Sequence, residues 1–129
     1  MTLVQDRSYA ARAYADAALV ASGTATLETA LIGTPMIIVY KMSPFSFLMG
    51  RLFVNVSHIG LANIIAGRTI VPELIQSDAN PERMAKELLA ILTDEERKTQ
   101  IRKDLSGIRE KLGSPGAAER AAQSALEIM

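Results

Sequence analysis

Short apolar runs alternate with helical patterns in the first part of the chain. A run centred on residues 19–21 predicts a buried strand, and the uncharged, β-branched run Met36–Tyr40 predicts a second one. Residues 8–18 are rich in alanine and residues 24–32 have a helical composition. Gly33 then predicts a left-handed cap that ends the second helix. The order is therefore helix, strand, helix, strand.

The middle of the chain has a less regular pattern. Val54–Ile59 and Thr69–Val71 have the composition of strands, and Pro72 would stop the second of them. Residues 61–67 predict a loop with a short helical turn, and Glu73–Gln76 predicts one further turn. We therefore expect a third strand between residues 54 and 71.

The last third of the chain is patterned as helix. Asn80–Glu82 combines a capping residue, a proline and an acidic first turn, and Thr93–Glu96 has the spacing of a capping box. A narrow alanine face after Ser114–Pro115 predicts a final helix that packs closely against another. Four apolar residues at helical spacing predict the buried stripe of the helix before it: Ile101, Leu105, Ile108 and Leu112.

Alternation of strands and helices predicts an α/β fold, a Rossmann-like parallel sheet with helices on both faces. The 129 residues, 49% hydrophobic and 22% charged, suffice for one domain with a core. We expect residues 1–129 to form this single domain, with the C-terminal helices at about 80–129.

Charge and composition exclude several classes of function. Lys plus Arg equals Asp plus Glu at 14 each, and aromatic residues are scarce, so a nucleic-acid partner is not expected. There is no cysteine and a single histidine, His58, so neither a metal nor another cofactor is predicted. No apolar run is long enough to span a bilayer. The mixed charges of residues 94–109 are typical of a solvated helix face.

The segment Ser22–Thr26 carries the candidate chemistry. A strand ends, Gly23 turns the chain and a helix begins, which places unpaired amides at the carboxyl edge of a parallel sheet. A phosphate binds well at such a helix terminus, and Thr24 and Thr26 could add hydroxyl donors. Glu28, about one turn further, suits the two hydroxyls of a ribose. The same residues also suit ordinary helix capping, and spacing alone leaves both interpretations open.

Three separated segments resemble one enzyme family, lipid-A-disaccharide synthase. They are ADAALVASGTATLETALIGTPMIIVYKMSPFSFLMGRLF, IGLANIIAGRTIVPELIQ and the tail REKLGSPGAAERAAQSALEIM. The resemblance implies the C-terminal domain of a two-domain GT-B glycosyltransferase, which binds the UDP of UDP-2,3-diacylglucosamine. It also implies transfer of the sugar to 2,3-diacylglucosamine 1-phosphate in lipid A biosynthesis, forming a β-1,6 disaccharide and releasing UDP.

The resemblance implies eight positions that bind the UDP-sugar donor: Ser22, Gly23, Thr24, Thr26, Glu28, Asn63, Arg68 and Glu73. The first three would face the diphosphate, with Thr26 nearby. Glu28 would hold the ribose and Asn63 would contact the donor at the cleft. Arg68 and Glu73 match family positions without an assigned role. Leu61–Ala62 departs from the family's usual Leu-Pro.

The amino-terminal domain of that family has no counterpart here. It would carry the acceptor site and the base that activates the acceptor hydroxyl, so no catalytic residue is assigned to this chain. We expect weak UDP binding without turnover, and an acylated glucosamine phosphate acceptor reached through the missing domain. Three alternatives remain open: a non-catalytic UDP-sugar-binding subunit, a structural or dimerisation module, and an epimerase or transferase for another UDP-sugar.

The segment Ser43–Phe53 predicts a helix that is apolar on more than one face. One interpretation is contact with a membrane surface or an acyl chain. The other is burial under the missing domain or in a homodimer interface. We therefore expect the protein in the cytoplasm, either free or bound peripherally to the inner membrane.

Overall fold

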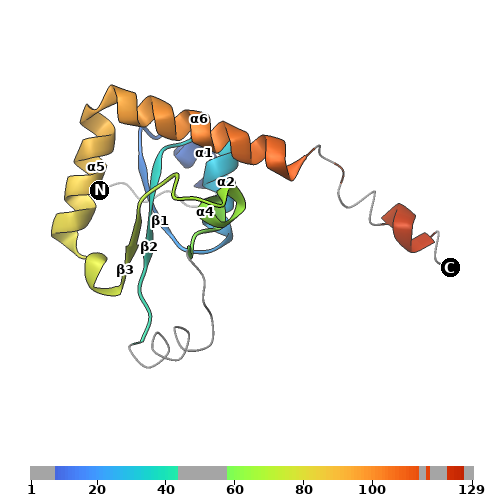
Figure 1. Ribbon diagram of the computed structural model, residues 1–129, viewed down its shortest axis with the longest axis horizontal. Coiled ribbons are helices and arrows are strands. Elements are labelled where there is room, and N and C mark those ends of the chain that lie inside the picture. The colour runs from blue at the N-terminus through green and yellow to red at the C-terminus, as the bar shows by residue number, and fades with distance from the viewer. Residues whose placement is uncertain (1–7, 44–57, 114–115, 117–121, 127–129) are drawn as a thin grey trace.

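The structure, a computed structural model, describes residues 8–43, 58–113, 116 and 122–126. Helices and strands alternate along most of this part of the chain (Figure 1). In chain order they are α1 Ser8–Ala13, β1 Ala18–Ala21, α2 Thr24–Ile32, β2 Met36–Tyr40, α4 Leu61–Ala66, β3 Glu73–Ile75, the 3-10 helix η1 Gln76–Asp78, α5 Pro81–Thr93 and α6 Glu95–Leu112.

The three strands form a parallel sheet in the order β1-β2-β3. Ala18 of β1 lies opposite Met36 of β2, and Ile38 of β2 lies opposite Glu73 of β3. The central strand is the most buried, because helices cover both faces of the sheet: Met36, Ile37 and Ile38 are at most 1% exposed. The predicted α/β fold with a parallel sheet is confirmed.

Helices surround the sheet on three sides. Figure 1 shows α2 and α4 on one face, α5 on the other and α6 across the amino ends of the strands. Helix α6 contacts α2, α4 and α5, which its stripe of apolar residues explains. Ile101, Leu105 and Ile108 of that stripe are buried as predicted, whereas Leu112 at the end is exposed. The carboxyl ends of the strands are left free of this helix.

The prediction for the third strand was wrong. Thr69–Val71 is not a strand, because the amides of Ile70 and Val71 donate to the side chain of Asn63 instead of to a neighbouring strand. The strand begins after Pro72, whose carbonyl accepts a hydrogen bond from the Ile38 amide. Glu73–Ile75, predicted as part of a helical turn, forms β3. Proline is compatible with this place because it precedes the strand.

Helix boundaries follow capping chemistry, with one correction. Gly33 has the predicted left-handed conformation, and the Asn80 side chain accepts the Arg83 amide as an N-cap. The predicted capping box was assigned one residue early, since Asp94 is the N-cap of α6 and the Thr93 hydroxyl bonds back to Leu89.

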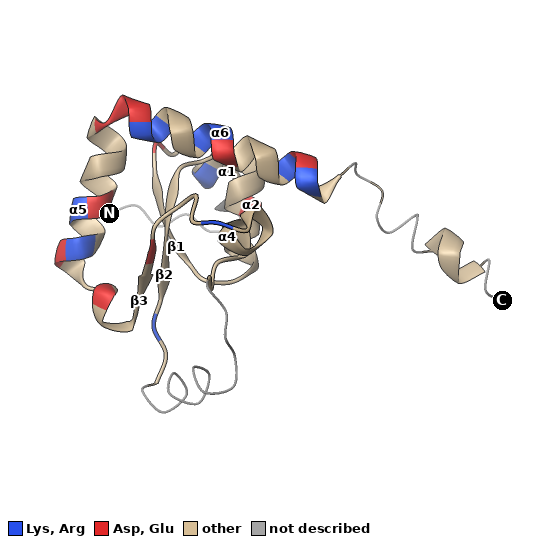
Figure 2. Ribbon diagram, in the orientation of Figure 1, with Lys and Arg blue, Asp and Glu red and all other residues tan. Residues whose placement is uncertain are grey.

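Charge is distributed unevenly over these elements. Figure 2 shows acidic and basic residues concentrated along α5 and α6, while α2 and α4 carry few. No helix in the described part of the chain is both long and apolar enough to cross a membrane. The predicted strand Val54–Ile59 and the predicted apolar helix Ser43–Phe53 lie largely outside the described residues. Residues 122–126 are helical and exposed, so the close packing predicted there is not formed within the described chain.

Candidate functional site

The turn between β1 and α2 lies at the carboxyl edge of the sheet. The Ser22 amide donates to the Val39 carbonyl at 2.9 Å, which extends the pairing of β1 and β2 by one step. Gly23 then adopts φ 146° and ψ −165°, a conformation that only glycine tolerates without strain. The glycine thus lets the chain leave the sheet and enter α2 within two residues.

Three amides of this turn are unused. The first hydrogen bond of α2 runs from the Thr26 amide to the Gly23 carbonyl at 3.1 Å. Within the described residues, the amides of Gly23, Thr24 and Ala25 make no hydrogen bond, and no side chain caps the helix. Gly23 and Thr24 are exposed. Such a terminus can bind an anion, because its N–H groups and the helix dipole both favour negative charge.

The three hydroxyls of the turn differ in their availability. Thr26 is fully buried and its hydroxyl donates to the Gly23 carbonyl at 2.7 Å. The Ser22 hydroxyl donates to the Ile59 carbonyl at 3.4 Å, a long contact between the turn and the loop before α4. The exposed Thr24 hydroxyl has no partner within the described chain. Thr24 is therefore the hydroxyl most available to a ligand.

Glu28 lies one turn further along α2, half exposed. One of its carboxylate oxygens accepts a hydrogen bond from the Arg12 guanidinium at 2.8 Å, and that guanidinium comes from α1. The side chain of Arg12 is 18% exposed and that of Glu28 is 55% exposed. The ion pair orients the carboxylate and leaves acceptor capacity on its second oxygen.

Asn63 is fully buried in α4 and makes four hydrogen bonds inside the chain. Its Oδ1 accepts from the amides of Ile70 and Val71 at 2.8 and 3.1 Å. Its Nδ2 donates to the Val71 carbonyl at 2.9 Å and to the Glu73 carboxylate at 2.7 Å. These bonds use the full capacity of the amide. Direct contact with a donor, expected above, would require one of these bonds to be replaced.

Glu73, the first residue of β3, gathers donors from the loop before α4. Besides Asn63, its carboxylate accepts from the amides of Ile59 and Gly60 at 2.9 and 3.1 Å. The sequence motif that contains Asn63 and Glu73 gives each a separate place and does not indicate that they bond to each other. A polar residue within the apolar helix LANIIA was the signal that a buried partner must exist.

Gln76 was missed by the sequence analysis. It directly follows β3, has φ 53° and uses its side-chain amide as a clamp on the chain leaving β2. Its Oε1 accepts from the Met42 amide at 2.8 Å, and its Nε2 donates to the Met42 carbonyl at 3.1 Å. A left-handed conformation at a non-glycine residue is unfavourable, and the two hydrogen bonds to Met42 offset that strain at the carboxyl edge.

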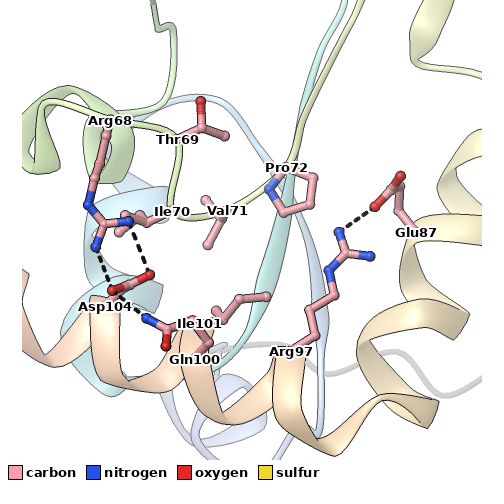
Figure 3. A pocket seen from close by; sticks show the side chains of 10 residues that line it. All are labelled: Arg68, Thr69, Ile70, Val71, Pro72, Glu87, Arg97, Gln100, Ile101 and Asp104. Carbon is pink, nitrogen blue, oxygen red and sulfur yellow. Dashed lines mark hydrogen bonds and ion pairs between the residues drawn. The ribbon is translucent and has the colours of Figure 1, made fainter.

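Arg68 lies at the opposite edge of the sheet, in an open hollow of about 540 Å³. Figure 3 shows its guanidinium turned toward Asp104, with Nη2 and Oδ1 2.6 Å apart, and Arg97 turned toward Glu87. The hydrogen bond from Arg68 lowers the pKa of Asp104 below its ordinary value of 3.8, against the opposing effect of burial, and Gln100 adds to the lowering. The structure therefore does not bring Arg68 together with Ser22–Glu28.

No metal centre is apparent in the described residues, where no three His, Cys, Asp or Glu side chains are grouped for one. His58 is partly buried and precedes Ile59, whose amide and carbonyl are both bonded. The available chemistry at the carboxyl edge is thus that of hydrogen-bond donors for an anion and a carboxylate nearby.

Comparison with known proteins assigns the chain to one enzyme family. The family profile described as lipid-A-disaccharide synthetase matches residues 1–128. The chain belongs to this family. The lipid-A-disaccharide synthase of Syntrophus aciditrophicus is 58% identical over 127 residues, which cover 98% of this chain and 33% of that protein.

Two further relatives carry the same name. The lipid-A-disaccharide synthase of Nitrosococcus oceani is 49% identical over 88% of this chain and 30% of its own length. That of Geobacter sulfurreducens is 44% identical over 100% of this chain and 34% of its own length. The chain therefore spans about a third of the length of the curated relatives that it matches.

Proposed function

We propose that this chain is the donor-binding part of a lipid-A-disaccharide synthase, a glycosyltransferase of lipid A biosynthesis. The donor would be UDP-2,3-diacylglucosamine, bound through its UDP group. The observation that carries the proposal is the turn after β1, where three adjacent amides at the start of α2 are free of hydrogen bonds within the described chain. Membership of the family supports the choice of a sugar nucleotide over other anions.

The diphosphate would occupy the turn itself. The amides of Gly23, Thr24 and Ala25 would donate to its oxygens, and the exposed Thr24 hydroxyl would add a fourth donor. A side chain at Gly23 would project into the open space in front of the turn. Glycine leaves this space free, so a diphosphate can come close to the backbone amides. No basic side chain is required, since the amides and the helix dipole supply the positive potential.

The ribose would be held by Glu28. Its carboxylate is half exposed and fixed on one side by Arg12, so it can accept hydrogen bonds from a diol. In this proposal the ribose would lie beside one carboxylate, about one helical turn from the diphosphate.

Transfer of the sugar would need a base beside the acceptor hydroxyl, which we assign to a part of the family's proteins outside this chain. Neither carboxylate described near the turn is assigned that role: Glu73 accepts three N–H groups, and Glu28 pairs with Arg12 and would hold the ribose. We therefore expect the chain alone to bind UDP weakly and to show no turnover.

Calorimetry with UDP and 2′-deoxy-UDP tests this function. Wild type should bind UDP more tightly than the deoxy ligand. Glu28→Gln should lose about tenfold in UDP affinity, since a charge-assisted hydrogen bond is roughly twice as strong as the neutral one that glutamine can still accept. The preference for UDP over its deoxy form should shrink in the same variant. Glu96→Gln, an exposed change in α6, is the matched control. Absence of binding at millimolar UDP, beside clear binding by a full-length relative, would refute the proposal for this chain.

A further inference from the structure

The carboxylate of Glu73 joins β3 to the start of α4 and the loop that directly precedes it. It receives the amides of Ile59 and Gly60 from the loop before α4, and the side-chain amide of Asn63 from α4 itself. The three donor distances lie between 2.7 and 3.1 Å. Hydrogen bonds to an ionised carboxylate are among the stronger ones in proteins, so this group fixes the loop firmly onto β3.

Gly60 shows how closely the loop is seated on the sheet. A Cβ at this position would overlap with Cδ1 of Ile38 and would lie 3.2 Å from Oε1 of Glu73. The backbone of Gly60 has φ −80° and ψ 131°, which any residue can adopt. Glycine is therefore required at this position because a side chain would not fit between the loop, β2 and the Glu73 carboxylate. The backbone conformation itself does not require it.

The same loop reaches the turn after β1. The Ile59 amide is held by Glu73, while the Ile59 carbonyl accepts the hydroxyl of Ser22. Ser22 immediately precedes Gly23, whose unusual conformation opens α2. A continuous chain of contacts therefore runs from the start of β3 to the residue before the three free amides. The Ser22–Ile59 contact, at 3.4 Å, is the longest of these links.

We infer that Glu73 and Asn63 are positioning residues for the diphosphate-binding turn. They fix the position of residues 59 and 60, and the contact of Ile59 with Ser22 then helps to fix the amides of Gly23 and Thr24 at the carboxyl edge. Both residues act through the chain and not through the ligand: all hydrogen-bonding groups of Asn63 are used, and the Glu73 carboxylate already accepts three N–H donors. This inference rests on the proposed function of the turn.

The arrangement also explains how a carboxylate is tolerated beside an anion site. An uncommitted carboxylate close to the turn would repel a diphosphate, but three N–H donors surround that of Glu73, which reaches the turn only through Ile59, and offset its charge. Replacement by glutamine keeps the size and removes the charge, yet turns one acceptor into a donor. That donor would face either the Ile59 amide or the pair formed by Gly60 and Asn63.

The test is Glu73→Gln in the whole 129-residue chain, followed by amide NMR without ligand and by calorimetry with UDP. We expect the amide resonances of Ser22–Ala25 to move and the UDP affinity to fall roughly tenfold. Ile108→Val, a buried change in α6, is the control that weakens the fold elsewhere and should do neither. A role confined to stabilising β3 and α4 would leave the Ser22–Ala25 amides in place, and that result would overturn the inference.

If Glu73→Gln does not fold, Ser22→Ala breaks the same chain of contacts at its other end. Ser22 is only partly buried, and the change removes its link to Ile59 while leaving the Glu73 bonds intact. We expect the resonances of Ile59 and Thr24 to move together; movement of Ser22's own neighbours alone, with Ile59 unchanged, would overturn the inference. Failure of wild type to bind UDP would count against the proposed function, whereas the resonance shifts report on positioning independently of any ligand.

Discussion

The two edges of the sheet contrast in how their hydrogen-bonding groups are used. At the amino edge, an open hollow of about 540 Å³ is lined by two arginines, and each is paired with a carboxylate: Arg68 with Asp104 and Arg97 with Glu87. At the carboxyl edge, the turn after β1 has little side-chain charge, but three amides and one hydroxyl are without partners in the described chain.

This difference shows why a hollow lined by charges is a poor guide to the site. An anion that enters the amino-edge hollow must compete with carboxylates already bonded to both guanidinium groups, so much of its binding energy would be offset. An anion at the carboxyl edge displaces only water from the amides of α2 and meets the positive end of the helix dipole. Unused donors, not volume, distinguish the candidate site.

The largest effect on UDP affinity is expected from Gly23→Ala at the start of α2, and Gly33→Ala at the end of the same helix is its control. Gly23→Ala forces a side chain into φ 146°, at a cost of about 1–3 kcal/mol, or moves the turn and its amides. We expect the UDP affinity to fall by more than about tenfold, which calorimetry can measure. Gly33→Ala, at φ 87°, should cost about 1–2 kcal/mol of stability and leave UDP affinity unchanged.

The pair separates binding from folding, because both changes strain a positive-φ glycine of the same helix. Thermal unfolding of both variants gives the stability loss for comparison. If Gly33→Ala lowered UDP affinity as much as Gly23→Ala does, the loss could not be attributed to the turn at Gly23. The proposal that this turn binds the diphosphate would then be wrong.

A smaller effect is expected from the two threonines of the turn. Thr24→Val removes the exposed, unpartnered hydroxyl and should lower UDP affinity about three- to tenfold with little change in stability, since one hydrogen bond contributes about 0.5–1.5 kcal/mol. Thr26→Val removes a buried hydroxyl that bonds to the Gly23 carbonyl and should instead lower stability by about 1–3 kcal/mol. A titration with UDP and a denaturant melt of each variant would reveal whether the two roles are exchanged.

Sequence patterns predicted the fold where local chemistry decides it. The strands at residues 19–21 and 36–40, the left-handed Gly33 and the Asn80 cap depend on neighbouring residues and were confirmed. The first strand is not buried as predicted, since only Val20 of β1 is buried and Leu19 is 48% exposed. The third strand was misplaced because its position depends on Asn63, seven and eight residues away, which takes the amides of Ile70 and Val71. No periodicity within residues 69–76 could indicate that competition.

The candidate site was predicted unevenly for the same reason. The turn at Ser22–Gly23 follows from a strand, a glycine and a helix in sequence, and the structure has it at the carboxyl edge. The separation of Arg68 from that edge, and the link from Glu73 through Ile59 to Ser22, depend on tertiary contacts. Ligand roles of the eight selected positions stay predictions.

The smallest effect is expected at the amino edge, from Asp104→Asn. The Arg68 hydrogen bond lowers the pKa of Asp104 in the folded protein, whereas the unfolded chain keeps a value near 3.8. The ionised carboxylate therefore stabilises the fold above about pH 4, and this contribution is lost as the pH falls through the folded-state pKa. Since Arg68 is 60% exposed, the contribution should be at most about 1 kcal/mol.

Denaturant melts of wild type and Asp104→Asn across the acidic range test this directly. The difference in unfolding free energy should be largest near neutral pH and should shrink as Asp104 becomes protonated, while UDP affinity at neutral pH is the same in both proteins. A loss of UDP affinity comparable to that of Thr24→Val would contradict the contrast between the edges. It would mean that a ligand senses the Arg68–Asp104 pair from the far end of the sheet.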